Sequence, residues 1–341
     1  MRYFLRSVAG IACLAALSCT GCSTDGTGPT RSGASSSSPS TATATATAPG
    51  TSYAPYVSAT TASANDTAGS PSAYNLAFVI SDGGGCTPKW DGSRDIADPA
   101  VKSRIAALTS SGAAVRVSFG GAAGTELAAV CRSASELAGA YAAALDAAGA
   151  TRADFDIEGD DLTDSDAVAM RSEAIALLQK ERTDLTVSYT LPVMPSGLDA
   201  DSLALLHSAN DSGVKVSTVN IMAMNYGSTY AGDMGDYAIA SAQAAHDQLQ
   251  DVFGLSSDEA WQGLALTSMI GDNDIAGETF TLSDAAQVRS FAEGKGLAWV
   301  SMWSTFRDQQ CEGGDTSSND AATNCSGVSQ GAGAFAQALS G

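Results

Sequence analysis

The chain is poor in basic residues. Across its 341 residues, 17 Lys and Arg stand against 37 Asp and Glu, which leaves a formal net charge of −20 at pH 7. Proteins that bind nucleic acid or an anionic membrane do so through clustered basic side chains. The composition therefore argues against both of these partners and against a polyanionic substrate, whereas a neutral substrate is compatible with it.

Histidines and metal-binding cysteine patterns are equally scarce. The two histidines, His207 and His246, lie in stretches with helical periodicity, so no Ser-His-Asp triad and no His-based zinc site can be assembled from them. The domain has no CxxC pair, and the glycine run 83–85 lacks the GxGxxG spacing of a nucleotide site. We therefore expect no metal and no cofactor.

The apolar run near the N-terminus is short. It covers residues 8–17, follows two arginines and precedes small residues, which is the pattern of an export signal and not of a membrane-spanning helix. The box that ends at Cys22 resembles a bacterial lipoprotein cleavage site, although Cys19 stands where Leu is expected. We predict a signal peptide over 1–22 with lipidation at Cys22, and cleavage by ordinary signal peptidase is the alternative.

Residues 23–50 contain almost only Ser, Thr, Ala, Gly and Pro. Such a segment cannot bury enough apolar surface to offset its ordering entropy, so we predict a flexible tether. A signal, a lipidation site and a tether together predict an extracellular protein, either secreted or anchored to the outer face of the cell membrane. The tether is followed by one domain over 51–341, which we expect to act as a monomer and to meet the membrane only through its anchor.

Four cysteines fall in this domain: Cys86, Cys131, Cys311 and Cys325. An even number of cysteines in an exported protein predicts two disulfides, for which three connectivities exist. We favour Cys86–Cys131 and Cys311–Cys325, because the second pair closes a short loop rich in Gly, Ser and Asp.

The domain alternates short β-branched or aromatic runs with longer Ala- and Leu-rich stretches. The strands are predicted at 53–58, 74–81, 114–119, 153–158, 185–191, 214–224, 263–269 and 297–303. Helical patterns lie between most of them, at 99–109, 133–148, 164–182, 201–208, 235–252 and 282–294. This alternation is typical of a (β/α)8 TIM barrel, and an open doubly wound sheet would be expected to carry a nucleotide fingerprint. The first unit is the weakest, because 60–72 is too rich in Ser, Thr and Gly to predict a helix.

The fourth predicted strand carries three carboxylates at alternate positions, Asp154, Asp156 and Glu158. Because successive side chains of a strand point to opposite faces, these acids share one face, and Phe155 and Ile157 share the other. Acids crowded on a buried face push their proton affinities apart, as in an active site, and Glu158 would stand at the C-terminal strand end where barrel active sites lie. A half-exposed edge strand with a solvated acidic face is the alternative.

Further motifs accompany the acidic triplet in chain order. Beside DFDIE at 154–158, the sequence has SFGG at 118–121, NIMAMNY at 220–226, TSMIGDND at 267–274 and SMWSTFRD at 301–308. These stretches resemble the DxDxE core, the SxGG signature, the sixth-strand motif and the Trp-bearing last strand of family 18 glycoside hydrolases, the chitinase family. The segment 267–274 resembles a bacterial and archaeal branch of that family.

The resemblance implies a catalytic scheme in which the 2-acetamido oxygen of the substrate is the nucleophile. Glu158 would then protonate the glycosidic oxygen and later deprotonate water. Asp156 would orient the acetamido group and stabilise the oxazolinium intermediate. Asp154 would lie behind Asp156 and share a proton with it.

The resemblance also implies a set of substrate-binding positions: Ser118, Gly120, Gly121, Met222, Asn225, Tyr226 and Trp303. Trp303 would form an apolar floor under the sugar, with a core Trp as the alternative. Ser118 would hydrogen-bond Asp154. A common family pattern has Tyr-Asp where this chain has Met224-Asn225, so Tyr226 is the candidate for the missing hydroxyl.

The expected substrate is chitin or another glycan that contains N-acetylglucosamine. The leading hypothesis is an extracellular chitinase with retaining chemistry. An endo-β-N-acetylglucosaminidase acting on N-glycans is an alternative, because loops outside the motifs set substrate length and branching. A non-catalytic chitin-binding lectin is the third reading, although such proteins typically lose the acid that is present here as Glu158.

Overall fold

A computed structural model describes residues 50–312 and 324–341 of the chain. The predicted signal peptide 1–22, its lipidation site Cys22 and all of the tether 23–50 except Gly50 lie outside the described residues. Within the described ranges, no helix is both long and apolar enough to cross a membrane.

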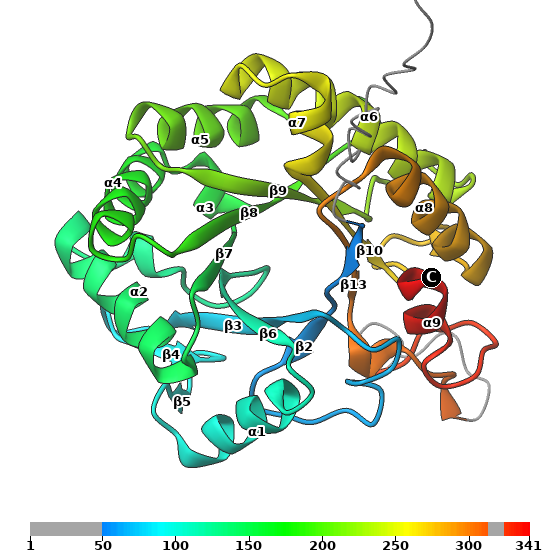
Figure 1. The fold of residues 1–341 in the computed structure, drawn as a ribbon, viewed down its shortest axis with the longest axis horizontal. Helices are drawn as coiled ribbons and strands as arrows, with labels where there is room; N and C mark the ends of the chain where they lie inside the picture. The colour runs from blue at the N-terminus through cyan, green and yellow to red at the C-terminus, as the bar shows by residue number, and fades with distance from the viewer. Residues whose placement is uncertain (1–49, 313–323) are drawn as a thin grey trace, which may run out of the picture. The chain divides into compact units, whose positions relative to one another are not determined.

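Parallel strands form a ring at the centre of the domain, with helices around the outside (Figure 1). The strands lie at the positions predicted from the sequence: β1 (Ser52–Tyr53), β2 (Tyr56–Ser58), β3 (Ala73–Ser81), β6 (Ala114–Gly120), β7 (Arg152–Asp156), β8 (Thr186–Pro192), β9 (Val216–Ala223), β10 (Leu264–Met269) and β13 (Trp299–Trp303). From β3 to β13, each of these strands pairs in parallel with the next one along the chain.

The ring closes through the first predicted strand, which is present as two short pieces. β1 pairs with β13 on one side, and β2 pairs with β3 on the other. The break between them falls at Ala54 and Pro55, because proline has no N–H with which to continue a ladder. The carbonyl of Pro55 instead accepts a hydrogen bond from Asn75 N at 2.9 Å. The predicted TIM barrel is therefore confirmed.

The helices that follow the strands also lie where the sequence predicts them: α1 (Pro99–Thr109), α2 (Ala134–Ala148), α4 (Ser165–Glu181), α5 (Ala200–Asp211), α6 (Met234–Phe253) and α8 (Leu282–Lys295). Each starts at a side-chain cap. At α2, for example, Ser133 Oγ accepts from Glu136 N at 3.2 Å. The described chain between β2 and β3 forms turns and no helix, as its Ser, Thr and Gly content predicts.

Several short elements were not predicted, since each is too short to show a period. They are β4 (Pro88–Trp90), β5 (Arg94–Asp95), β11 (Gly271–Asp272), β12 (Thr279–Phe280), α3 (Asp160–Thr163), α7 (Ser257–Gln262), α9 (Ala334–Ser340) and the 3₁₀ turns η1 (Leu127–Ala129) and η2 (Thr305–Arg307). The β11–β12 hairpin matters for the site, because it follows β10 at the C-terminal end of the barrel.

The outer face of the strands packs against the helices through aromatic rings. Phe155 of β7 stacks on Phe119 of β6 at 5.4 Å and meets Tyr141 of α2 edge-on at 5.0 Å between ring centroids. β7 lies between β6 and β8, so the alternative of a solvated edge strand is wrong. The acidic face of β7 must therefore point into the barrel.

Both predicted disulfides are present. Cys86 and Cys131 are joined with a Cα–Cα distance of 4.6 Å, and Cys311 and Cys325 with a Cα–Cα distance of 5.0 Å. The favoured connectivity is confirmed.

Candidate active site

Asp154 lies inside the barrel and is surrounded by hydroxyl groups. One carboxylate oxygen accepts from Ser118 at 2.7 Å and from Tyr56 at 3.0 Å, and the other accepts from Ser188 at 2.7 Å. Thr190 Oγ1 lies 2.9 and 3.1 Å from the two oxygens. The predicted hydrogen bond from Ser118 is thus present. The hydroxyl groups of this shell replace the water that the buried carboxyl group of Asp154 has lost.

Asp156 lies two residues after Asp154 on the same face of β7, and its side chain is buried. Its carboxyl group is hydrogen-bonded to that of Glu158. Burial, followed by the charges of Glu158 and Asp154, raises the pKa of Asp156 well above its ordinary value. Its Oδ1 atom is buried and has no hydrogen-bond partner among the residues that the structure describes. The hydrogen bond of the Asp156 carboxyl group is made with Glu158, and the proton expected between Asp154 and Asp156 stays a prediction.

Glu158 lies two residues beyond the end of β7, although the sequence pattern predicts it inside the strand. The last ladder bond runs from Ile157 N to Thr190 O, after which Gly159 turns the chain at φ +58°. Burial raises the pKa of Glu158; the hydrogen bond from Asp156 opposes this rise, and the charge of Asp274 adds to it. Leaving the strand lets the Glu158 carboxyl group turn back toward Asp156.

Gly120 and Gly121 let the neighbouring strands approach each other. Both have positive φ, +96° and +93°, and a Cβ on Gly120 would lie 2.1 Å from the Asp156 carbonyl oxygen. A Cβ on Gly121 would lie 2.9 Å from the Phe78 ring. These glycines do not line the pocket that holds the carboxyl groups. They allow the close approach of the chain segments around that pocket and do not contact a ligand in it.

A pocket opens at the C-terminal end of the barrel above these groups. We call it the catalytic pocket, and it is lined by Tyr56, Phe78, Ala122, Asp156, Glu158, Thr190, Met222, Met224, Asn225, Thr267, Met269, Asp274 and Trp303. Trp303 is partly exposed, stacks on Phe78 at 5.6 Å and meets Tyr56 edge-on at 5.9 Å. Its indole therefore belongs to the pocket wall, and the alternative of a purely structural core Trp does not hold.

Asn225 reaches the catalytic pocket from the end of β9 and is tied to the β11–β12 hairpin. Its Nδ2 atom donates to Asp274 at 2.9 Å, and its Oδ1 atom accepts from Asp274 N at 3.0 Å. Asn225 has a φ of +55°, which an Asn tolerates better than most residues. The pair brings the Asp274 carboxylate to the rim of the pocket that contains Glu158.

Tyr226 does not line the catalytic pocket. Its side chain is buried, and its hydroxyl group accepts from Ser241 Oγ at 3.3 Å. Its ring packs on Tyr230 and Tyr237. The left-handed turn at Asn225 breaks the strand alternation and directs the next side chain away, so the structure does not support Tyr226 as the hydroxyl that polarises a substrate. The tyrosine that does line the pocket is Tyr56.

Sequence reasoning missed several residues of the site: Tyr56, Phe78, Ser188, Thr190 and Asp274. Ser188 and Thr190 carried a usable signal, because they alternate on β8 in register with Asp154 and Asp156. Asp274 lies at the end of the motif 267–274, although that motif did not indicate a contact with the acids of β7. Tyr56 and Phe78 carried no signal, since nothing local shows that they meet these acids.

Metal chemistry finds no support in the described residues. No three potential ligands among His, Cys, Asp and Glu lie close enough there to hold an ion. His246 is instead stacked on Trp261 at 4.0 Å and hydrogen-bonded to Asp247 and Ser257. His207 lies in α5, as predicted.

The chain matches no model of a known protein family. It is 34% identical over 275 residues to a protein of Escherichia coli named "Probable bifunctional chitinase/lysozyme", and 32% identical over 274 residues to endochitinase 11 of Metarhizium anisopliae. These matches cover 75% of this chain but only 31% and 52% of the two relatives. The chain therefore spans about a third to a half of each relative.

Solved structures show the same relationship. The catalytic domain of the hyperthermophilic chitinase from Pyrococcus furiosus is 28% identical with a TM-score of 0.74, over 85% of this chain and 94% of that one. A GH18 chitinase from Pseudoalteromonas aurantia, 15% identical with a TM-score of 0.53 over 74% of this chain and 94% of that one, shares the fold. Fold and site together thus define a glycoside hydrolase barrel of the chitinase type. The chain belongs to glycoside hydrolase family 18.

Proposed function

We propose that this protein is an extracellular chitinase, which hydrolyses β-1,4 bonds between N-acetylglucosamine units with retention of configuration. The observation that supports this most directly is the hydrogen-bonded pair Asp156 and Glu158 in a pocket walled by the Trp303 indole. An indole offers a flat apolar surface for the C–H face of a sugar, and the two carboxyl groups share one proton to be transferred. The names of the relatives point to the same substrate.

The first step uses the proton held between Asp156 and Glu158. The acetamido oxygen of the sugar on Trp303 attacks its own anomeric carbon, and the bond from that carbon to the glycosidic oxygen breaks. Glu158 delivers the proton to the departing oxygen. Both carboxyl groups are then ionised, beside a cationic oxazolinium ion. That cation offsets the repulsion from neighbouring carboxylates, which adds to burial in raising the pKa of Asp156 in the free protein.

Asp156 also offers its Oδ1 atom as an acceptor for the acetamido N–H of the substrate. Its Oδ1 atom is buried without a partner, and a buried acceptor without a hydrogen bond is costly. Accepting the N–H of the substrate there satisfies this atom and turns the acetamido oxygen toward the anomeric carbon. Asp154 lies behind Asp156 and is held in place by its shell of hydroxyl groups.

In the second step Glu158 takes a proton from water. The water oxygen bonds to the anomeric carbon while the bond from that carbon to the acetamido oxygen breaks, and the Asp156–Glu158 pair again holds one proton. Two successive inversions at the same carbon give overall retention.

The direct test of the acid is Glu158→Gln. Gln keeps the shape and hydrogen bonding but cannot release a proton, so kcat on chitin oligomers should fall at least about 100-fold while their binding survives. Glu181→Gln, at an exposed position at the end of α4, should leave both unchanged. A Gln variant with nearly wild-type turnover would remove Glu158 from this role. Cleavage of a high-mannose glycopeptide in preference to chitin oligomers would favour the N-glycan alternative.

The nucleophile is tested with substrates that lack it. Replacing the N-acetylglucosamine before the broken bond by glucosamine or glucose should abolish cleavage, with kcat and kcat/KM lost together. A thiazoline analogue of the cyclised intermediate should inhibit, and Asp156→Ala should weaken that inhibition. Efficient cleavage of a cellulose oligomer, or a glycosyl group trapped on Asp154 or Asp156, would instead indicate a carboxylate nucleophile.

We also propose that the protein works outside the cell, anchored by lipid at Cys22 or released by ordinary cleavage. The signal-like residues 1–22 and the tether 23–50 support this proposal. Fractionation of cells that express the full chain, together with mass measurement of the mature N-terminus, would distinguish an anchored from a released form. A product that retains residues 1–22 in the cytosol would contradict the proposal.

A further inference from the structure

A positively charged side chain lies inside the barrel on the N-terminal side of the acids. Arg116 of β6 comes two residues before Ser118, whose hydroxyl group donates to Asp154 at 2.7 Å, so strand alternation directs both side chains into the barrel. Ser118 and Asp154 are in register across β6 and β7. Arg116 therefore lies one layer of side chains deeper than Asp154, and only 6% of it is exposed.

Two side chains of other strands hold the Arg116 guanidinium group. Its Nη1 atom donates to Asn75 Oδ1 of β3, and its central carbon lies 4.0 Å from the ring centroid of Trp299 in β13. Asn75 is oriented for this contact, because its Nδ2 atom donates to the Ala54 carbonyl oxygen at 2.9 Å. That carbonyl group lies at the break between β1 and β2. The guanidinium group is thus fixed by two partners that carry no negative charge.

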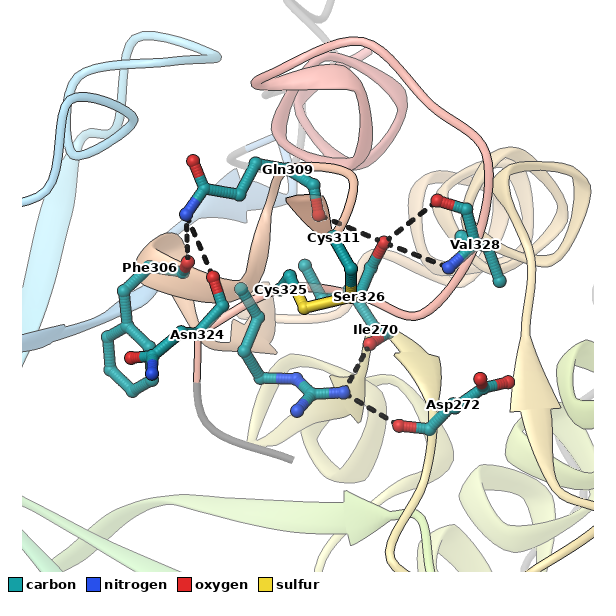
Figure 2. Close-up of a disulfide and its surroundings, with 10 residues drawn as sticks. Ile270, Asp272, Phe306, Gln309, Cys311, Asn324, Cys325, Ser326 and Val328 are labelled. Carbon is teal, nitrogen blue, oxygen red and sulfur yellow. Dashed lines mark hydrogen bonds between the residues drawn. A yellow bond between two sulfur atoms is a disulfide. The ribbon is translucent and has the colours of Figure 1, made fainter. Parts of the chain in front are cut away.

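Arg116 differs in this respect from other buried arginines. Arg171 forms an ion pair with the Glu126 carboxylate at 2.8 Å. Arg307 donates to two backbone carbonyl oxygens, at 3.0 and 2.6 Å, beside the disulfide drawn in Figure 2. Among the residues that the structure describes, no carboxylate forms an ion pair with Arg116. Because a buried charge without an ion pair opposes folding, its presence inside the barrel calls for a compensating interaction.

The acids in the next layers supply that interaction. Burial lowers the pKa of Arg116 to about 10, and the charge of Asp154 opposes this lowering. Arg152, two residues before Asp154 on β7, adds to the lowering, whereas Tyr56 of β2 opposes it. The Arg116 guanidinium group therefore stays charged at neutral pH. Since a Coulomb interaction acts on both of its partners, this positive charge favours negative charge on the acids that it faces.

The row of acids thus has charges of opposite sign at its two ends. At the pocket end, the charge of Asp274 adds to burial in raising the pKa of Glu158. At the inner end, Arg116 places a positive charge below Asp154. Salt and water screen interactions between buried groups less than interactions at the surface. The buried cation can therefore influence the protonation of the row although it does not line the catalytic pocket.

We propose that Arg116 is a positioning residue for hydrolysis, whose buried positive charge hinders the row Asp154, Asp156 and Glu158 from taking up a further proton. This inference rests on the proposed function. A row with a further proton has less negative charge to offset the oxazolinium cation, so activity is lost as the pH falls. Arg116 acts through Asp154 and touches none of the reacting atoms.

The test is the acidic limb of the pH dependence of kcat/KM on a chitin oligomer. Arg116→Gln removes the charge and can still hydrogen-bond Asn75. Without the cation the acids take up a further proton more readily, so the loss of activity at low pH should begin about 0.5–1 pH unit higher than in the wild type. Arg116→Lys keeps the positive charge at acidic pH and should leave this limb where it is in the wild type.

Arg289→Gln is the matched control. It makes the same change in net charge, but Arg289 is paired with Glu293 on α8, outside the ring of strands, so the acidic limb should not move. Asn75→Asp is an independent variant that places a carboxylate beside Arg116 and neutralises its charge without removing it. The acidic limb should then shift in the same direction as in Arg116→Gln. Thermal melting of each variant measures any loss of packing, which alone shifts no pH limb.

The outcomes separate the inference from the function on which it rests. A wild-type protein that cleaves no chitin oligomer would contradict the proposed function itself. An active wild type whose acidic limb is unchanged in Arg116→Gln and Asn75→Asp would overturn only the role of Arg116. An equal shift in Arg116→Lys or Arg289→Gln would overturn it too, because the shift would not follow the buried charge. Failure of both neutralising variants to fold would assign Arg116 to the fold and likewise remove it from this role.

Discussion

At the scale of single residues, two aspartates on the same strand face have different hydrogen-bond partners. Asp154 accepts hydrogen bonds from Ser118, Ser188 and other hydroxyl groups inside the barrel, which replace the water it has lost. Among the described residues no hydroxyl group is found to donate to Asp156, which bonds Glu158 instead, and burial raises its pKa. Whether an aspartate of this face is surrounded by hydroxyl groups thus depends on which side chains the neighbouring strands present.

The charge of Asp274 predicts a pH effect. Burial raises the pKa of Glu158, and Asp274 raises it further, so Asp274→Asn should lower the pKa of Glu158. Because Glu158 must be protonated to act as an acid, the loss of activity at high pH should begin at a lower pH in this variant. Asn keeps the size of the side chain and can still hydrogen-bond Asn225.

The measurement is the pH dependence of kcat/KM on a chitin oligomer. Asp199→Asn is the matched control, because Asp199 lines a pocket next to the catalytic pocket and Asn still caps α5. An unchanged basic limb in Asp274→Asn, or an equal shift in Asp199→Asn, would exclude a specific effect of Asp274.

At the scale of elements, the contact between β6 and β7 depends on the absence of a side chain at Gly120. A Cβ there would meet the Asp156 carbonyl oxygen at 2.1 Å, and the φ of +96° is strained for any other residue. The two strands carry Ser118 and Asp154 in register, so their separation also sets the hydrogen bond between these side chains.

Gly120→Ala should therefore destabilise the domain by about 3 kcal/mol or more and abolish activity in whatever fraction folds. Gly139→Ala is the opposite case, because Gly139 lies exposed inside α2 with no atom within 4 Å of its added Cβ. That change should stabilise by about 0.5–1 kcal/mol. Chemical denaturation of both variants measures the difference, and equal stability would refute the close-packing argument.

At the scale of the whole molecule, two disulfides cross-link loops of the barrel domain. The Cys86–Cys131 bond closes a sequence separation of 45, and the Cys311–Cys325 bond closes one of 14. In the chain-entropy view, the longer loop gains more from closure, so the first bond should contribute about 4 kcal/mol and the second about 3 kcal/mol.

The mature domain should accordingly show no free thiol when it is labelled under denaturing, non-reducing conditions. Two or more reactive cysteines among Cys86, Cys131, Cys311 and Cys325 would contradict the disulfides. Removing the first pair should lower the unfolding free energy more than removing the second, as measured by denaturant titration of each double Ser variant. A larger loss from the second pair would contradict the argument from loop entropy.

The sequence by itself determined the barrel, its helices and the shared face of Asp154, Asp156 and Glu158. These features follow from local periodicity, because a strand alternates its side chains whatever surrounds it. The disulfide pairing could be inferred as well, since a short polar loop needs a cross-link. The ends of the elements were less predictable. The strand that was expected to include Glu158 ends at Asp156, and the chain turns at Gly159.

Only the tertiary structure decided which side chains meet. It placed Tyr56 and Thr190 on Asp154, although they lie 98 and 36 residues from it in the sequence. It brought Asp274 to the pocket through Asn225, and it turned Tyr226 away from the pocket into an aromatic cluster. Such contacts have no local signature, because they depend on strand register and on loop turns, where side-chain alternation ends. The raised pKa values of Asp156 and Glu158 are likewise a property of the assembled barrel, since burial is the largest cause of both rises.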